Sequence, residues 1–453
     1  MSVELNKKLN DSKFTRWMAL GVVAFTMMAA YFVNDVMAPL KTMLEGQLGW
    51  GSTDFGFYTG AYSFLNVFFL MLIWGGLILD RFGIRFTGKL ATILMVFGTA
   101  LQYYGITELA DSNSVYFGYK AGVFISSVGF SIFGVGAEVA GITVTKLIAK
   151  WFKGKEMATA MGVQVALARI GSQAAYTLAI PVAKNFHLDT PVLIGLVLLV
   201  GGLIAFFAFS VLDKKLDKQI QDDKTSVDEE KFSIKDVGAI FSNPGFWLIA
   251  LLCVLFYSCV FPFQKFATEL MVSKYGIDAD FAGSIVGLPA LGALILTPVF
   301  GSLVDSKGKA DNIMIIGAAM LIFVHLTYSI PSINGWWVAT VLMIILGIAF
   351  SLVPSAMWPS VAKIFPAHQL GTAYALIFFI QNIGLWGVPN LIGWIQKEFC
   401  ISETINGVNQ YDYTIPMLVF TGFATLSLVI GLLLKVANKK YGYGLEKANI
   451  EKK

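Results

Sequence analysis

A short turn bearing glycines and charges occurs twice in the chain. The first copy, residues 76–85, reads GLILDRFGIR and follows the pattern G-x-x-x-D-R-x-G-x-R. The second copy, residues 301–309, reads GSLVDSKGK, and its Asp305 lies 305 − 80 = 225 positions after Asp80 in a chain of 453 residues. Each copy lies between two long apolar stretches. A charged turn repeated at about half-length predicts two similar halves, each built from hydrophobic segments.

The composition and the apolar segments indicate a membrane protein. Hydrophobic residues make up 56% of the chain and charged residues 14%, whereas soluble domains carry about 25% charged residues. Twelve segments are long enough to span a bilayer, which takes roughly 20 apolar residues. They begin near Trp17, Asp54, Gly88, Tyr116, Glu156, Pro191, Pro244, Asp280, Asn312, Gly335, Gln369 and Thr414. We therefore expect an all-α membrane protein with twelve transmembrane helices in two pseudo-symmetric six-helix halves.

A charged, polar stretch divides these segments six and six. Its composition predicts a linker, with a short helix lying on the membrane near Phe232 to Ile240. The expected organisation is an N-terminal bundle over 1–212, a linker over 213–243, a C-terminal bundle over 244–436 and a tail over 437–453. Most of the 33 lysines and arginines fall on the side of the N-terminus. This bias predicts that both termini, the linker and the tail are cytosolic.

Several function classes lack their usual residues. The three cysteines form no disulfide framework, and the three histidines show no metal-ligand spacing. There is no Walker loop for ATP and no Ser/His/Asp arrangement in a plausible shared layer. The basic residues lie in short loops, which argues against nucleic acid as a partner. We expect no catalytic residues, no metal and no cofactor.

A second repeat identifies a pair of corresponding helices. Lys150-Trp151-Phe152 precedes an Arg-Ile-Gly that begins at Arg169, and Lys363-Ile364-Phe365 precedes an Asn-Ile-Gly that begins at Asn382. The two sets are 363 − 150 = 213 positions apart. The fifth and eleventh predicted helices are therefore counterparts, and Arg169 corresponds to Asn382.

The duplicated turn resembles the signature of the major facilitator superfamily, G-x-L-A-D-R-x-G-R, in the loop after the second helix. Shorter stretches are similar to a family of lysosomal dipeptide carriers within it: WFKGKE at 151–156, ARIGS at 168–172, HQLGTAY at 368–374, Tyr62-Ser63, Asn66, Phe261-Pro262-Phe263, Trp358-Pro359 and Gln381-Asn382. The resemblance implies a two-bundle carrier. This chain lacks an N-terminal acidic dileucine sorting signal, so we expect a bacterial relative in the inner (cell) membrane.

One departure from the superfamily concerns proton coupling. Near the middle of the fourth helix, many members carry an arginine in an R-x-x-x-G-x-G context. This chain has Phe130 at that position, before Gly134 and Gly136. That arginine relays protons in some members of the superfamily. Because this chain lacks it, the resemblance gives weaker support for proton-coupled transport.

Two opposite charges are expected at one depth in the membrane. Glu138 lies twelve residues before Lys150, and Arg169 lies thirteen after Glu156, so both are roughly 18–20 Å from the cytosolic helix ends. Charges inside a membrane are costly and mark functional sites. One interpretation is an ion pair that joins the fourth and fifth helices. The other is a zwitterion site, with Arg169 for a carboxylate and Glu138 for an ammonium group.

Further polar residues extend this candidate site. Asp35, with Tyr31 and Asn34 on the first helix, is about 28 Å from Arg16 along the helix axis; it is either a second ammonium partner or a solvated helix end. Lys265 either receives a carboxylate or extends to water. A final set of polar or amphipathic residues is expected to bind the uncharged N–H and C=O groups of a peptide: Tyr62, Asn66, Trp358, Gln381 and Asn382. The alternative is that these side chains form hydrogen bonds between helices.

The duplicated turn has its own functional interpretation. Asp80 is positioned to stabilise the N-terminus of a neighbouring helix, and Arg81 and Arg85 to hold carboxylates or lipid phosphates. We expect a cytosolic gate that closes in one state and opens in the other; a positive loop that only sets topology is the alternative. The gate hypothesis covers Gly76, Asp80, Arg81, Gly83, Arg85, Gly301, Asp305 and Gly308.

Taken as a whole, the sequence favours a transporter of small zwitterionic solutes, dipeptides above all, working by alternating access as a uniporter or a proton symporter. Its expected partners are a small-molecule substrate and the lipid bilayer, with an accessory membrane subunit as a further candidate. One alternative is an organic anion or sugar-type carrier. Another, from a different class, is a membrane sensor or partner subunit that transports nothing.

Overall fold

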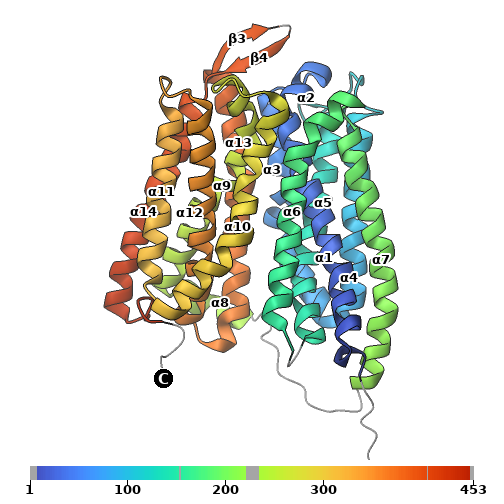
Figure 1. Ribbon diagram of the computed structural model, residues 1–453, viewed down its shortest axis with the longest axis vertical. Coiled ribbons are helices and arrows are strands. Elements are labelled where there is room, and N and C mark those ends of the chain that lie inside the picture. Colours follow the sequence, from blue (N-terminus) through green and yellow to red (C-terminus); the bar gives the residue numbers. More distant parts are fainter. Residues whose placement is uncertain (1–7, 153–154, 221–233, 406, 449–453) are drawn as a thin grey trace, which may run out of the picture.

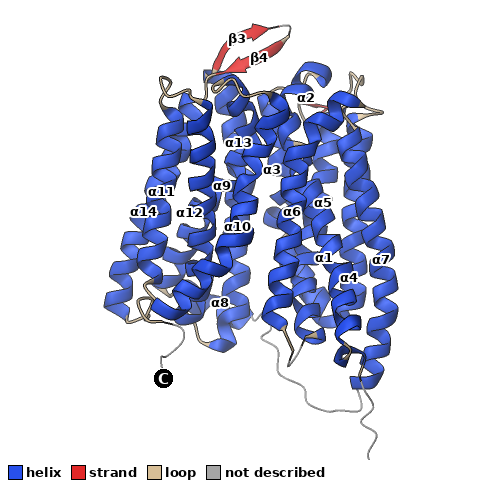
Figure 2. Ribbon diagram, in the orientation of Figure 1, coloured by secondary structure: helices blue, strands red, loops and turns tan. Residues whose placement is uncertain are grey.

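The computed structural model describes residues 8–152, 155–220, 234–405 and 407–448. Its long helices form two bundles side by side (Figure 1), and little else is present besides helix (Figure 2). The first bundle contains α1 (Lys13–Val36), α3 (Ser52–Phe68), α4 (Met71–Ile106), α5 (Ala121–Trp151), α6 (Met157–Asn185) and α7 (Thr190–Ile220). The second contains α9 (Pro244–Ser273), α10 (Ala279–Lys307), α11 (Ala310–Ser329), α12 (Trp336–Ile364), α13 (Leu370–Phe399) and α14 (Thr414–Tyr441).

Short elements distinguish the two ends of the molecule. The antiparallel hairpin of β3 (Ile401–Ile405) and β4 (Val408–Tyr411) lies at the same end as α2 (Lys41–Leu48) (Figure 1). We call this the hairpin end, and the opposite end, where α1 begins and α14 finishes, the termini end. The remaining short elements are η1 (Leu9–Asp11), η2 (Ala38–Leu40), β1 (Val115–Tyr116), β2 (Tyr119–Lys120), α8 (Ile234–Phe241) and η3 (Ala367–Gln369).

The described residues make twelve passes through the bundles. Ten of their helices are long and apolar enough to cross a membrane. The more polar α6 forms the eleventh pass. The twelfth is formed by α3 together with the start of α4, which a turn inside α4 separates from the rest of that helix. Two bundle helices run past the predicted bundle boundaries at 212 and 436, because α7 continues to Ile220 and α14 to Tyr441. The predicted surface helix overlaps α8, and its first residues, 232 and 233, lie outside the described ranges.

The chain reverses within α4 at Gly83. This glycine has φ 74°, in the left-handed region that favours a residue without Cβ. Before the turn, positions 75 and 80 lie beside positions 139 and 146 of α5, so the two segments run parallel. After it, positions 98 and 105 lie beside positions 129 and 126, so the direction is opposite. The second predicted span is therefore α3 plus the start of α4, interrupted at Leu70, which has φ 53°.

The two bundles meet closely at the hairpin end. α3 packs on α13 so tightly that a Cβ on Gly56 would lie 2.5 Å from the carbonyl oxygen of Pro389. A buried ion pair joins Lys41, 1% exposed, to Glu269 at 2.6 Å, and Tyr413 donates a hydrogen bond to the same carboxylate. Removing one partner of such a pair leaves an uncompensated buried charge, which costs about 3–5 kcal/mol. The hairpin end is thus the closed end, and the bundles diverge toward the termini end (Figure 1).

Candidate functional site

A cavity of about 270 Å³ lies between the bundles. Its wall is formed by α1, α3, α5 and α6 of the first bundle and by α9, α12 and α13 of the second. Most of the residues predicted to bind substrate lie in this wall: Tyr31, Asn34, Tyr62, Glu138, Arg169, Lys265, Trp358, Gln381 and Asn382. The other two, Asp35 and Asn66, lie outside it. The structure therefore brings most of the predicted side chains to one place, and their roles stay predictions.

Glu138 and Arg169 face this cavity without pairing with each other. The Oε1 atom of Glu138 accepts a hydrogen bond from the hydroxyl of Tyr62 at 3.0 Å. The Arg169 guanidinium lies 5.6 Å from the ring centre of Tyr31 and 4.9 Å from that of Phe350, within cation–π range. Among the described residues, no carboxylate is within 4.0 Å of Arg169. The interpretation of Glu138 and Arg169 as a simple interhelical ion pair therefore does not hold in this structure.

Asp35 and Lys265 pair across the two bundles on the hairpin side of the cavity. Their side chains are 2.7 Å apart and each is 11% exposed. Lys265 also donates to the carbonyl oxygen of Asn34 at 2.7 Å, and Ser172 donates to Asp35 at 2.6 Å. Asp35 is thus neither a solvated helix end nor open to a ligand here, and Lys265 does not extend to water. The pair contributes to closing the cavity on this side.

The predicted amide groups differ in their surroundings. Asn382 donates to the carbonyl oxygen of Phe378 at 3.0 Å, and its side-chain oxygen accepts no hydrogen bond from the described residues. Gln381 accepts a contact from the Cys253 thiol at 3.5 Å. Both line the cavity. Asn66 is buried on α3 away from the cavity, and neither of its amide atoms has a partner among the described residues.

Three of the aromatic residues in the wall were not predicted from the sequence as binding residues. Tyr257, Phe261 and Phe378 line the cavity beside Trp358, which was predicted. A spacing of four residues puts Tyr257 and Phe261 on one helix face. The same spacing is common elsewhere in a chain with 37 phenylalanines, so the sequence alone cannot single out this pair.

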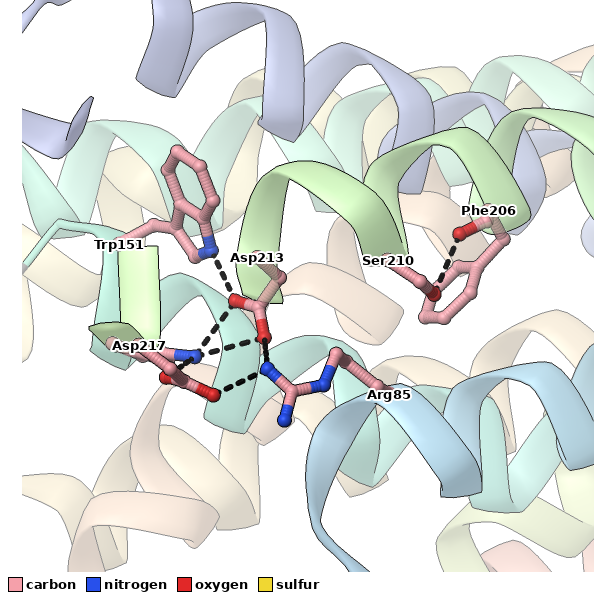
Figure 3. Close-up of polar contacts among 7 residues, drawn as sticks. Arg85, Trp151, Phe206, Ser210, Asp213 and Asp217 are labelled. Carbon is pink, nitrogen blue, oxygen red and sulfur yellow. Dashed lines mark hydrogen bonds and ion pairs between the residues drawn. The ribbon is translucent and has the colours of Figure 1, made fainter. Parts of the chain in front are cut away.

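The first copy of the repeated turn is held by charges of its own bundle. Asp80 pairs with Lys146 of α5 at 3.1 Å, where a helix N-terminus was the expected partner. Arg85 pairs with Asp213 at 3.4 Å and with Asp217, both on α7 (Figure 3). These contacts join helices of one bundle.

A second group of contacts completes this cluster around Asp213, which is 1% exposed. Lys150 lies 2.8 Å from the carboxylate. The indole of Trp151 donates to it at 2.8 Å (Figure 3). Arg81 is exposed and lies over the ring of Phe82. The cluster around Asp213 thus ties α4, α5 and α7 together, and the gate role of the turn stays a prediction.

The second copy of the turn is held by the segment after α14. The backbone N–H groups of Lys309 and Ala310 donate to the carbonyl oxygens of Glu446 and Leu445, both at 3.0 Å. Lys363 donates to the carbonyl oxygen of Lys447 at 2.7 Å. Residues 442–447, which we call the folded-back segment, therefore cap the start of α11. Gly301 and Asp305 precede these contacts on α10, and Gly308, with φ 67°, packs against the folded-back segment.

Twelve helical passes in two bundles, with a cavity lined by both, define a multi-pass membrane transporter. Residues 21–389 match the family model described as Major Facilitator Superfamily. The chain belongs to this superfamily.

Named relatives and solved structures agree with this assignment. The human lysosomal dipeptide transporter MFSD1 (Homo sapiens) is 28% identical over 443 residues, covering 95% of this chain and 88% of that protein. The MFSD1 of Gallus gallus is 30% identical over 332 residues, 70% of each chain. The crystal structure of the nucleoside transporter NupG has a TM-score of 0.68 at 13% identity, covering 92% of this chain and 98% of NupG. That of the D-xylose-proton symporter has a TM-score of 0.68 at 14% identity, with 92% and 97% coverage. At these identities the two structures establish the fold alone.

Proposed function

We propose that this protein carries dipeptides, or other small zwitterions such as amino acids, across a membrane by alternating access. The observation that carries the proposal is the pair of opposite charges, Glu138 and Arg169, in one cavity and not bound to each other. A zwitterion supplies a counter-charge to each. The name of the MFSD1 relatives, lysosomal dipeptide transporter, points to the same substrate class.

Each cavity group has a role in this proposal. The Arg169 guanidinium offers paired N–H donors to the substrate carboxylate. Glu138, oriented by Tyr62, accepts the substrate ammonium group. The amides of Gln381 and Asn382 bind peptide N–H and C=O groups. The charged groups of the ligand then replace the water that Glu138 and Arg169 lose on burial.

The transport cycle follows from the closed hairpin end. We infer that the termini end faces the cytosol of a bacterial cell, as the lysine and arginine bias predicts. Rocking of the two bundles then requires the Asp35–Lys265 and Lys41–Glu269 pairs to separate. The first bundle, including α7 to its end at Ile220, and the second bundle, including α14 to its end at Tyr441, move as the two bodies. Any accessory membrane subunit would bind outside the cavity.

A thermal-shift screen of the purified protein tests the substrate class. Dipeptides and amino acids are expected to raise the apparent melting temperature, because a ligand that binds only the folded state stabilises it by mass action. Arg169→Ala is expected to abolish the shift. Lys397→Ala is the matched control, since it removes one cation from an exposed site (62%) outside the cavity. Shifts by organic anions, sugars or nucleosides with none by dipeptides would overturn the proposal, and no shift with any class would favour a sensor or partner subunit.

Two energetic modes fit this cavity, uniport and proton symport. In symport, Glu138 is the proton carrier, because it is the carboxylate among the described residues that line the cavity. Dipeptide uptake into proteoliposomes, measured with and without a proton gradient, separates the modes. Uptake that is unchanged when the gradient is collapsed identifies uniport.

A further inference from the structure

The two bundles give the cavity two chemically different walls. Among the described residues, the first bundle contributes Glu138 and Arg169, and the second contributes one charged residue, Lys265. Lys265 is already neutralised by Asp35 at 2.7 Å. The second wall also carries four aromatic side chains, beside the amides of Gln381 and Asn382 and three aliphatic or proline residues: Tyr257, Phe261, Trp358 and Phe378. We call these four residues the aromatic wall.

The aromatic wall is held in place by contacts among its own members. Tyr257 and Phe261 stack with ring centres 5.4 Å apart and planes at 8°. Trp358 and Phe378 stack at 4.7 Å and 23°. The Trp358 indole donates to the Tyr257 hydroxyl at 3.2 Å, which joins the two stacks. Because three helices, α9, α12 and α13, supply these rings, the surface is preorganised.

We propose that the aromatic wall is the side-chain subsite of the carrier, and that Trp358 is its main specificity-determining residue. This inference rests on the proposed function. A dipeptide held by Glu138 and Arg169 places its charged ends on the first bundle, so its side chains project toward the second. Burial of apolar surface there favours binding, and ring-to-ring contact adds to it.

The same wall discriminates against small and acidic side chains. Glycine leaves the rings uncovered, so it gains nothing from them. An acidic side chain loses its water against ring faces that carry partial negative charge, with Lys265 already occupied by Asp35. We expect Phe-Ala and Leu-Ala to bind about tenfold more tightly than Gly-Gly, as expected for burial of one large apolar side chain. Asp-Ala is expected to bind more weakly than Leu-Ala by a similar factor.

The test compares dissociation constants of Phe-Ala, Leu-Ala, Asp-Ala and Gly-Gly for the purified full-length protein and its variants. In Trp358→Ala, the ratio of Gly-Gly to Phe-Ala dissociation constants is expected to fall from about 10 to below about 3. Trp337→Ala is the matched control, because Trp337 lies on the same helix but is 61% exposed and outside the cavity. It is expected to keep the ratio.

A second variant serves if Trp358→Ala does not fold. Phe378→Leu keeps an apolar side chain and removes one ring of the stack, so the ratio of Gly-Gly to Phe-Ala dissociation constants is expected to fall below that of the unmodified protein. Equal binding of Gly-Gly and Phe-Ala by the unmodified protein would overturn the subsite, as would an unchanged ratio in both variants. Failure of every dipeptide, Gly-Gly included, to bind would instead overturn the proposed function.

Discussion

The two bundles share a framework but differ where they face the cavity. Arg169 of the first bundle corresponds to the neutral Asn382 of the second. With the same offset, 351 − 138 = 213, Glu138 corresponds to Ser351, which is buried and donates to the carbonyl oxygen of Gly347 at 2.8 Å. One bundle thus carries both unpaired charges, and the other supplies rings and amides. The difference indicates that a substrate is oriented by one bundle and selected by the other.

The second repeat differs in a comparable way at the termini end. Lys150 and Lys363 occupy corresponding positions. Lys150 binds the buried carboxylate of Asp213, whereas Lys363 binds a backbone carbonyl oxygen of the folded-back segment. The same framework position is therefore satisfied by a charge in one bundle and by a neutral dipole in the other.

The largest expected effect comes from making the first bundle resemble the second at the cavity. Arg169→Asn removes two charge-assisted hydrogen bonds to a substrate carboxylate, each worth about 1.5–3 kcal/mol. We expect uptake of a labelled dipeptide into proteoliposomes to fall at least about 100-fold. Asn382→Ala, a change at the corresponding position of the second bundle, is expected to reduce uptake less than about tenfold. Equal losses in the two variants would refute the division of roles between the bundles.

Next in size is the cluster around Asp213. Asp213→Ala leaves Lys150 and Arg85 without their shared buried partner, and both cations are partly exposed, 21% and 36%. We expect a loss of about 2 kcal/mol, below the range for fully buried pairs, seen as a lower melting temperature of the purified protein. Asp217→Ala, at a position 34% exposed, serves as the control and is expected to cost less. A smaller loss for Asp213 than for Asp217 would contradict the central position of Asp213.

A moderate effect is expected from Glu138→Gln, which keeps the shape of the side chain and removes its charge. Binding of a dipeptide with a free amino group is expected to weaken about tenfold, or about 1.4 kcal/mol. Binding of the same dipeptide with its amino group acetylated is expected to be equal in the variant and the unmodified protein. Titration of both ligands by calorimetry measures this. If the variant loses affinity for both ligands equally, Glu138 does not bind the ammonium group.

The smallest effect concerns the attachment of the folded-back segment to Lys363. Lys363→Met removes a hydrogen bond to a backbone carbonyl oxygen, which contributes about 1 kcal/mol. We expect a small decrease in melting temperature, and a larger one for Lys150→Met, whose partner is a buried carboxylate. The reverse order would show that the folded-back segment, and not the Asp213 cluster, is the stronger attachment.

Much of the fold was predictable because a membrane imposes simple rules on sequence. The lengths of the apolar segments predicted the helical passes, and the repeated turn predicted two similar halves. Depth along a helix placed Glu138 and Arg169 at one level, and the structure finds both in one cavity. The interruption of the second span at Leu70 was not predictable, since residues 66–71, NVFFLM, contain neither glycine nor proline. A break there depends on packing around a residue with positive φ.

Contacts between bundles were the least predictable part of the site. Asp35 and Lys265 are 265 − 35 = 230 positions apart, and no local pattern indicates that they pair. Helical depth puts them at a similar level, but it does not say which faces of α1 and α9 meet. The same limit applies to the aromatic wall, whose three helices come together only in the folded protein.

The folded-back segment also determines where this protein tolerates engineering. Leu445 is fully buried, its amide donates to the Asn438 side chain at 3.0 Å, and its carbonyl oxygen receives the amide of Ala310. An affinity tag or fluorescent fusion joined directly after Tyr441 would displace these groups and expose the start of α11. A fusion joined beyond Lys447 leaves these groups in place. The position of the fusion therefore determines whether the start of α11 stays covered in the purified protein.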